Sequence, residues 1–152
     1  MIIYLMRHGE AEKQASSDAA RELTRQGLMD NQAVIAKLNQ HTPMIDLAIM
    51  SPYQRARQTS SALRMYFPKL RFEVDKDLEP EASVYDLLDK IEHTQAKQVF
   101  LISHNPLISN LLALMVDGTL ETGRHMGTSQ IACVSMDIVA PGCAELIYTL
   151  TP

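Results

Sequence analysis

The chain has 152 residues, a length that suits one ordinary domain with its own hydrophobic core. Hydrophobic residues make up 46% of the sequence and charged residues 21%, which are values typical of globular rather than disordered proteins. The net charge of −4 argues against a general nucleic-acid-binding protein, because such proteins usually carry a basic excess. A local cationic site is still compatible with this charge.

The cysteines and the apolar segments indicate the compartment. Cys133 and Cys143 lack the spacing of a disulfide framework or a metal site, so we expect both to be reduced thiols. No apolar stretch approaches the roughly 20 residues of a membrane span. No basic segment precedes the short apolar run at the N-terminus, so this run does not have the pattern of a signal peptide. We therefore expect a cytoplasmic protein with no membrane partner.

The first strand is expected at Ile2–Met6, and a polar stretch over Glu10–Arg21 follows it. Thr24 has a side chain suited to the N-cap of a helix that runs to about Leu38. This helix is expected to turn three residues into the core, which are Leu28, Ile35 and Leu38.

The second strand is expected at Asp46–Met50, and a helix begins in the turn after it. Ser51 is expected as the N-cap, Pro52 as the first helical residue and Gln54 as the capping-box partner. The helix would end before Pro68. Its inward residues would be Ala56, Leu63 and Phe67.

The second half of the chain continues the alternation of strands and helices. Leu70–Val74 alternates like a strand, and the residues that follow show the i, i+3, i+4, i+7 spacing of an amphipathic helix at Val84, Leu87, Leu88 and Ile91. Gln98–Ile102 is the next buried strand. Asn105 can cap and Pro106 can open a very apolar helix over Leu107–Met115.

A loop over Asp117–Thr128 leads into two final strands near Gln130–Ile138 and Glu145–Thr149. These strands are close enough in sequence to pair antiparallel through Pro141-Gly142. No internal repeat or linker divides the chain. The elements predict a single α/β domain over residues 1–152, a three-layer sandwich with a mostly parallel central sheet of about six strands and helices on both faces.

Three of the expected strands end in residues that suit a phosphoryl group. Arg7-His8-Gly9 follows the first strand, the Ser51–Arg55 turn follows the second, and Ser103-His104 follows the strand at Gln98–Ile102. In open α/β folds, ligands bind at the carboxyl ends of the strands. Phosphoryl transfer needs a nucleophile, which a neutral imidazole can provide, and positive groups around the phosphate oxygens. Arginine is suited to the second task because its planar fork can hold two oxygens.

Each of these residues also has an ordinary interpretation. His8 alone fits a structural histidine, Arg55 a surface ion-pair partner and His104 part of a helix cap. Their occurrence at three separate strand ends favours a shared site. A metal site formed by His8, Glu10 and His104 is disfavoured, because Arg7 and Arg55 would repel a divalent cation. No Walker-type loop or G-x-G-x-x-G motif occurs, so we expect neither a metal nor a cofactor.

Several segments resemble the histidine phosphatase superfamily, which includes the phosphoglycerate mutases. The similar motifs are Met6–Gly9, Ser51–Thr59 and Ser103–Pro106. Within the superfamily, Asp18–Gly27 looks like the Asp-x-x-Arg-x-Leu-Thr-x-x-Gly segment of the small SixA-type phosphohistidine phosphatases, and Thr128–Ala132 resembles the start of their penultimate strand. The likeness covers essentially the whole chain in order.

The resemblance implies a minimal phosphoglycerate mutase-like fold and a set of roles. His8 would be the phosphorylated nucleophile, and the phosphate pocket would be formed by Arg7, Arg55 and His104. Arg21 would be an additional cation that is specific to the small subfamily.

The general acid of the larger relatives has no clear counterpart here. Their acid follows the third strand, where this chain reads Leu78-Glu79-Pro80-Glu81. Glu79 or Glu81 could serve, although a solvated loop carboxylate is the favoured interpretation. An imidazole leaving group, whose conjugate acid has a pKa of about 6.5, departs with little help, whereas an alkoxide needs a proton donor. The roughly thirty residues from Arg71 to Val99 leave no room for a helical insertion over the site.

These observations predict a metal-independent phosphatase that acts through a covalent phosphohistidine intermediate. Its substrate would be phosphohistidine on a protein partner, such as a phosphotransfer protein of a signalling phosphorelay, and phosphate would be released. One alternative is a small-molecule phosphomonoesterase of the same superfamily. Another is a non-catalytic module that binds phosphorylated partners, but His8 argues against it because binding alone needs no nucleophile.

Overall fold

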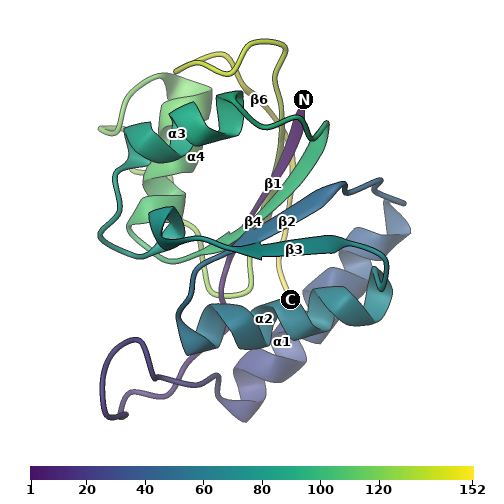
Figure 1. Cartoon of the computed structure of the whole chain (residues 1–152), viewed down its shortest axis with the longest axis vertical. Helices are drawn as coiled ribbons and strands as arrows, with labels where there is room; N and C mark the ends of the chain where they lie inside the picture. Colours follow the sequence, from purple (N-terminus) through teal and green to yellow (C-terminus); the bar gives the residue numbers. More distant parts are fainter.

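The computed structural model describes all 152 residues and contains a six-stranded sheet in the order β3-β2-β4-β1-β5-β6 (Figure 1). The strands are β1 (Ile2–Arg7), β2 (Leu47–Met50), β3 (Arg71–Val74), β4 (Gln98–Ser103), β5 (Ile131–Ser135) and β6 (Glu145–Leu150). The first four are mutually parallel, whereas β5 runs antiparallel to both β1 and β6. The predicted sheet, mostly parallel with an antiparallel final pair, is confirmed.

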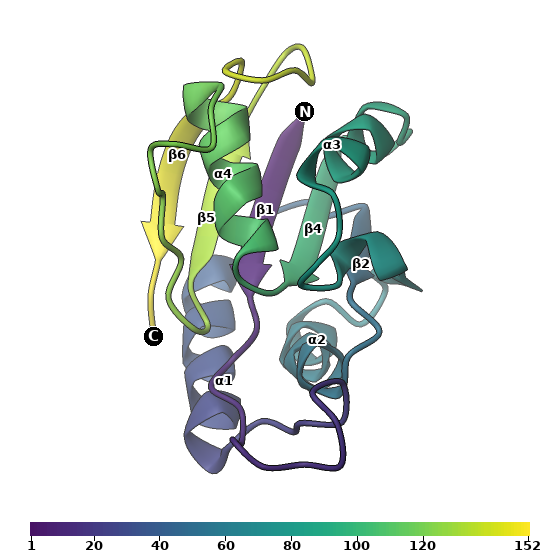
Figure 2. The same ribbon diagram turned by 90° about the vertical axis from the view of Figure 1, so that its left-hand side faces the viewer.

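Helices cover both faces of this sheet (Figures 1 and 2). They are α1 (Arg25–Gln40), α2 (Gln54–Tyr66), α3 (Val84–Glu92) and α4 (Leu107–Asp117), with a short 3-10 turn η1 (Lys76–Leu78) before α3. Successive side chains of a strand point to opposite faces. In β1, Ile3 and Leu5 accordingly pack with α3 and α4, while Tyr4 and Met6 pack with α1 and α2. The sheet is therefore the middle of three layers, as the sequence predicts.

One expected core position in the first turn of α1, Leu28, is wrong. Thr24 is the N-cap and accepts a hydrogen bond from the Gly27 amide, as predicted. Leu28, however, is 44% exposed. The buried face of α1 extends from Leu38 through Asn31 to Gly27 in the first turn. Gly27 is buried because it packs against the backbone of Glu10, where a Cβ would lie 2.2 Å from the carbonyl oxygen. Leu28 lies outside that buried face and is exposed to solvent.

The beginning of α2 also differs from the expectation. Ser51 is not the N-cap, because its amide donates to the Ile102 carbonyl and so extends the β2–β4 ladder by one residue. Its hydroxyl accepts only from the Tyr53 amide, and the helix starts at Gln54 without a side-chain cap. The helix ends before Pro68, as expected.

Two further boundaries are corrected. Asn105 does not cap α4: Pro106 occupies the N-cap position, and the Asn105 side chain instead accepts from the Ser109 hydroxyl and donates to the Met126 carbonyl. The penultimate strand ends at Ser135, three residues before the predicted end at Ile138, and Ile138 is exposed.

The two cysteines lie in different environments. Cys133 is buried, Cys143 is exposed, and both are free thiols, as predicted. None of the helices combines the length and apolar character that crossing a membrane would require.

The sheet brings the three predicted strand ends to one edge. Arg7 pairs with Ser103 and Met50 pairs with Ile102, so the residues that follow β1, β2 and β4 leave the sheet side by side. Between β3 and β4 the chain forms only η1 and α3. The prediction that no helical insertion covers this edge of the sheet is confirmed.

Candidate active site

His8 is held in one tautomer by its own neighbour. Its Nδ1 lies 2.6 Å from the Gly9 carbonyl oxygen, which can only accept, so Nδ1 carries the proton. The other nitrogen, Nε2, is then unprotonated, and it accepts a hydrogen bond from Nε of Arg55 at 3.1 Å. Its backbone is fixed on both sides, since the His8 amide donates to the Ser103 carbonyl and its carbonyl accepts from the Ser129 amide. The imidazole is therefore oriented with its nucleophilic nitrogen toward an arginine.

Burial and positive neighbours keep His8 neutral. The side chain is 7% exposed. Burial is the main reason that its pKa is lowered to about 4, and the positive charges of Arg55, Arg7 and Arg21 lower it as well. The hydrogen bond to the Gly9 carbonyl acts in the opposite direction but does not offset these effects. At neutral pH the ring is thus a neutral imidazole with Nε2 unprotonated, which is the form that attacks phosphorus.

His104 lies beside His8 with both ring nitrogens free of hydrogen-bond partners, although the residue is only 1% exposed. The two ring centroids are 4.9 Å apart. Burial, with contributions from His8 and Arg55, lowers the pKa of His104 to about 2. Nε of Arg7 is also buried without a partner, while Nη1 of Arg7 donates to the Met126 carbonyl. Buried polar groups normally have partners, so these three atoms are candidates to bind a polar ligand.

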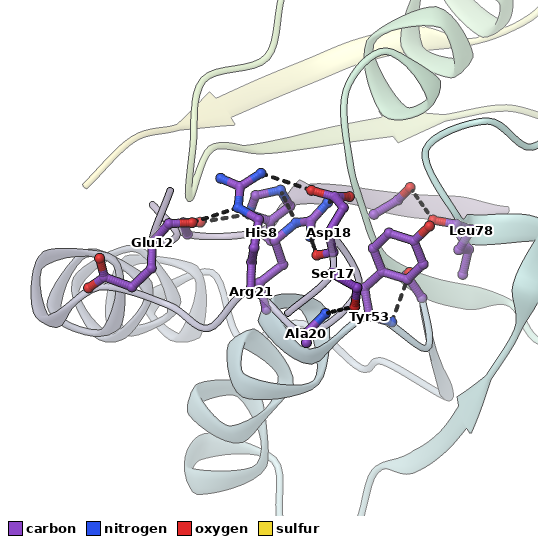
Figure 3. Close-up of polar contacts among 12 residues, drawn as sticks. His8, Glu12, Ser17, Asp18, Ala20, Arg21, Tyr53 and Leu78 are labelled. Atoms are coloured by element: carbon purple, nitrogen blue, oxygen red, sulfur yellow. Dashed lines mark hydrogen bonds and ion pairs between the residues drawn. The ribbon is translucent and has the colours of Figure 1, made fainter. Parts of the chain in front are cut away.

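Asp18, a loop residue that was not assigned from the sequence, forms ion pairs with Arg21 and Arg55 (Figure 3). Its carboxylate accepts from Arg55 at 3.0 Å and from Arg21 at 2.9 Å, and its carbonyl accepts from Arg55 at 2.6 Å. Burial opposes ionisation, but the hydrogen bonds from Arg21 and Arg55 prevail and lower the pKa of Asp18. Arg55 itself is 4% exposed. The loop is anchored to α2 by the Gln54 amide, which donates to the Ala19 carbonyl.

A buried polar network supports the turn after β1. The Gly9 amide donates to the Thr59 hydroxyl, which also accepts from the Asn31 amide group. Asn31 accepts in turn from the Ser129 hydroxyl. A Cβ on Gly9 would lie 2.7 Å from the Gly27 carbonyl oxygen, so only glycine fits this close approach to α1. The network fixes the position of His8 relative to α1, α2 and β5.

The candidate acids lie on the segment after η1. The Ser103 hydroxyl donates to the Leu78 carbonyl at 2.8 Å, which ties this segment to the end of β4. Glu79 is half-buried and Glu81 is exposed, and neither carboxylate makes a hydrogen bond or an ion pair within the protein. The side chain of Glu10, part of the disfavoured metal set, accepts from the Thr24 hydroxyl. The structure shows no cluster of three His, Cys, Asp or Glu side chains arranged to hold a metal.

The structure thus assembles the predicted residues into one arrangement. Arg55 contacts His8 directly, His104 packs against His8, and Arg7 is close enough to both to influence their pKa values. Arg21 joins through Asp18. A neutral imidazole surrounded by guanidinium groups can attack a phosphoryl group and stabilise the charge on its oxygens.

Two residues at the site were not assigned from the sequence. Asp18 precedes Arg21 by three residues, a spacing that allows an ion pair, and this signal was available. Tyr53 packs its ring against His104 with centroids 5.1 Å apart, and the Arg55 guanidinium carbon lies 5.0 Å from its ring centre. No sequence pattern indicated the position of Tyr53.

Comparisons with known proteins agree with this arrangement. A family model described as the histidine phosphatase superfamily (branch 1) matches residues 3–81. A phosphohistidine phosphatase SixA homolog of Haemophilus influenzae is 35% identical over 126 residues, which cover 74% of this chain and 76% of that protein. The phosphohistidine phosphatase SixA of Escherichia coli K12 is 31% identical over 144 residues, covering 90% and 86% of the two chains.

A solved structure of the protein histidine phosphatase SixA complexed with tungstate has the same fold. It matches with a TM-score of 0.86 and 29% identity over 100% of this chain and 97% of that one. With its fold, its strand-end motifs and these relatives, the chain belongs to the histidine phosphatase superfamily.

Proposed function

We propose that the protein is a phosphohistidine phosphatase in which His8 is the nucleophile and Arg7, Arg55 and His104 hold the phosphoryl group. The observation that carries the proposal is the state of His8. Its Nδ1 proton is committed to the Gly9 carbonyl, its pKa is lowered to about 4, and its Nε2 lone pair faces Arg55. Arg21 adds a further cation at the rim of the site, where it is linked to Asp18.

The reaction takes two steps. The Nε2 lone pair of His8 attacks phosphorus, and the bond between phosphorus and the substrate imidazole breaks with its electron pair moving to that imidazole nitrogen. The leaving imidazole departs neutral when its other ring nitrogen carries a proton. Water then attacks phospho-His8, the P–Nε2 bond breaks, and its electron pair returns to His8 while the water protons pass to phosphate and solvent. Guanidinium groups stabilise the charged phosphoryl oxygens in both steps.

The residues around the site support a leaving group that needs little acid catalysis. The hydrogen bonds from Arg21 and Arg55 keep Asp18 ionised at neutral pH, so it has no proton to donate. The carboxylates of Glu79 and Glu81 make no hydrogen bond or ion pair that would orient them. Imidazole is a far weaker base than an alkoxide, so a phosphohistidine suits this site better than a phosphate ester.

The partner we propose is a phosphohistidine-bearing protein, such as a phosphotransfer protein, and the setting is the cytoplasm. The relatives named above are phosphohistidine phosphatases, and one is named a protein histidine phosphatase. The connection from β3 to β4 adds only η1 and α3, so no inserted helices stand over the strand ends. The two free cysteines fit a reducing compartment.

A trapping experiment tests the proposal. Enzyme quenched in base during turnover of a phosphohistidine protein should carry phosphate on His8, labile to acid and stable to base. His8→Ala should abolish turnover and labelling, while the matched change His125→Ala at an exposed histidine should preserve both. A chelator should leave the rate unchanged. Label on a serine or cysteine, or a chelator-sensitive rate restored by zinc, would contradict the mechanism, and turnover of phosphate esters alone would favour the phosphomonoesterase alternative.

A further inference from the structure

The aromatic ring of Tyr53 contacts two of the groups that hold the phosphoryl in the proposed mechanism. It packs against the His104 ring with centroids 5.1 Å apart and planes tilted by 59°, and the Arg55 guanidinium carbon lies 5.0 Å from its centre. The side chain is half-buried and its hydroxyl makes no hydrogen bond within the protein. The Tyr53 side chain is therefore partly accessible to a ligand.

The ring of His104 lies against two other rings, those of His8 and Tyr53. The ring centroids of His8 and His104 are 4.9 Å apart and those of Tyr53 and His104 are 5.1 Å apart, so His104 packs against both other rings. In a reactive complex the attacking nitrogen lies ~3–3.5 Å from phosphorus. The leaving group departs on the side of phosphorus opposite His8. Arg55 and His104 hold the phosphoryl group in the proposed mechanism, so a residue that borders both is a candidate to contact the leaving group. Tyr53 is an aromatic residue that borders both.

We propose that Tyr53 packs against the leaving imidazole and so favours an aromatic leaving group over a small or aliphatic one. This inference rests on the proposed function, and it identifies a specificity residue rather than a further phosphate ligand. Aromatic pairs at tilted or offset geometry are stabilised beyond their buried area. An aliphatic alcohol or ammonia offers no ring to form such a pair. The contact therefore discriminates between leaving groups even when the phosphoryl group and the bond type are the same.

Two small phosphoramidates separate this role from support of the phosphate pocket. 1-Phosphoimidazole and phosphoramidate both contain a P–N bond, but only the first has an aromatic leaving group. We expect Tyr53→Ala to lower the ratio of their kcat/KM values, phosphoimidazole over phosphoramidate, by about 3- to 10-fold. Tyr53→Phe should restore the ratio because it keeps the ring. Tyr85→Ala, at an exposed tyrosine on α3, is the matched control and should leave the ratio unchanged.

The outcomes distinguish the inference from the proposed function. A fall in the ratio with Tyr53→Ala, restored by Tyr53→Phe, supports the inference. Equal loss on both compounds would overturn it, since Tyr53 would then act only by supporting Arg55 and His104. An unchanged ratio would overturn it as well. If the unaltered enzyme hydrolyses phosphate esters but neither P–N compound, the proposed function itself fails and the inference fails with it.

Discussion

The stability of the protein should fall steeply as the pH drops from 7.5 to 5.5, because two histidines are buried in the neutral form. The pKa values of His8 and His104 are lowered to about 4 and about 2 in the folded state. In the unfolded chain both return to about 6.5. Between these values the unfolded state binds more protons, so lowering the pH favours unfolding.

The magnitude follows from the unfolded pKa alone, since both folded pKa values lie well below this window. Each histidine should lower the free energy of unfolding by about 1.4 kcal/mol at pH 5.5 relative to pH 7.5, and the pair by about 3 kcal/mol. For a chain of this size, that corresponds to a decrease in Tm of roughly 6–10 °C. Carboxylates such as Asp18 and Asp117 do not contribute in this window. Their pKa values are lowered from 3.8, so the stability they provide is lost only at more acid pH.

Urea unfolding followed by circular dichroism at both pH values tests this reasoning. His8→Gln and His104→Gln should each remove about half of the decrease, and the double variant should remove nearly all of it. His125→Gln, at an exposed histidine, is the control and should retain the full decrease. A flat stability profile in the unaltered protein, or a full decrease in the double variant, would refute the assignment of two neutral buried histidines.

Two further predictions concern the carboxylates near the site. Asp18→Asn should tighten the binding of inorganic phosphate, measured by calorimetry, by about 2- to 5-fold, because it removes a partly exposed carboxylate that pairs with Arg55. Glu22→Gln on the same loop is the exposed control, and weaker binding in Asp18→Asn would show instead that Asp18 positions the arginine. Glu79→Gln and Glu81→Gln should barely slow turnover of phosphohistidine, whereas Arg55→Ala should lower kcat/KM by about 10²–10³-fold. A glutamate change as damaging as Arg55→Ala would identify a general acid and favour phosphate esters as substrates.

The strands could be predicted well from the sequence because their pattern is local and directly tied to burial. The apolar run Ile2–Met6 has no polar residue to turn toward solvent, as expected for a strand covered on both faces, and the structure buries it between two helix layers. The errors fall where a tertiary contact decides the boundary. The Ser51 amide joins the hydrogen bonds between β2 and β4 instead of starting a helix. Leu28 faces solvent because Gly27 packs on the backbone of Glu10. Neither contact leaves a local pattern in the sequence.

The placement of the candidate site followed from topology, whereas its internal contacts did not. Arg7-His8 and Ser103-His104 must meet at one edge once β1 and β4 pair in parallel. The topology brings these motifs together, but it does not determine which of their atoms are in contact. The pair formed by Asp18 and Arg55 joins residues 37 positions apart through the path of an irregular loop. The contact of Tyr53 with His104 likewise depends on how α2 begins.

The net charge of the site favours a doubly charged anion as its ligand. Arg7, Arg21 and Arg55 carry positive charge, Asp18 supplies a carboxylate that pairs with Arg21 and Arg55, and the two histidines are neutral. Three guanidinium groups and one carboxylate leave an excess of two positive charges. A phosphoryl dianion would balance that excess, and its oxygens could accept from the unpartnered Nε of Arg7 and, in place of the Asp18 carboxylate, from the Arg55 guanidinium. In the proposed mechanism the hydrogen bond from Arg55 Nε must leave His8 Nε2 before that lone pair can attack phosphorus, so binding of the dianion and exposure of the nucleophile would depend on the same side chain.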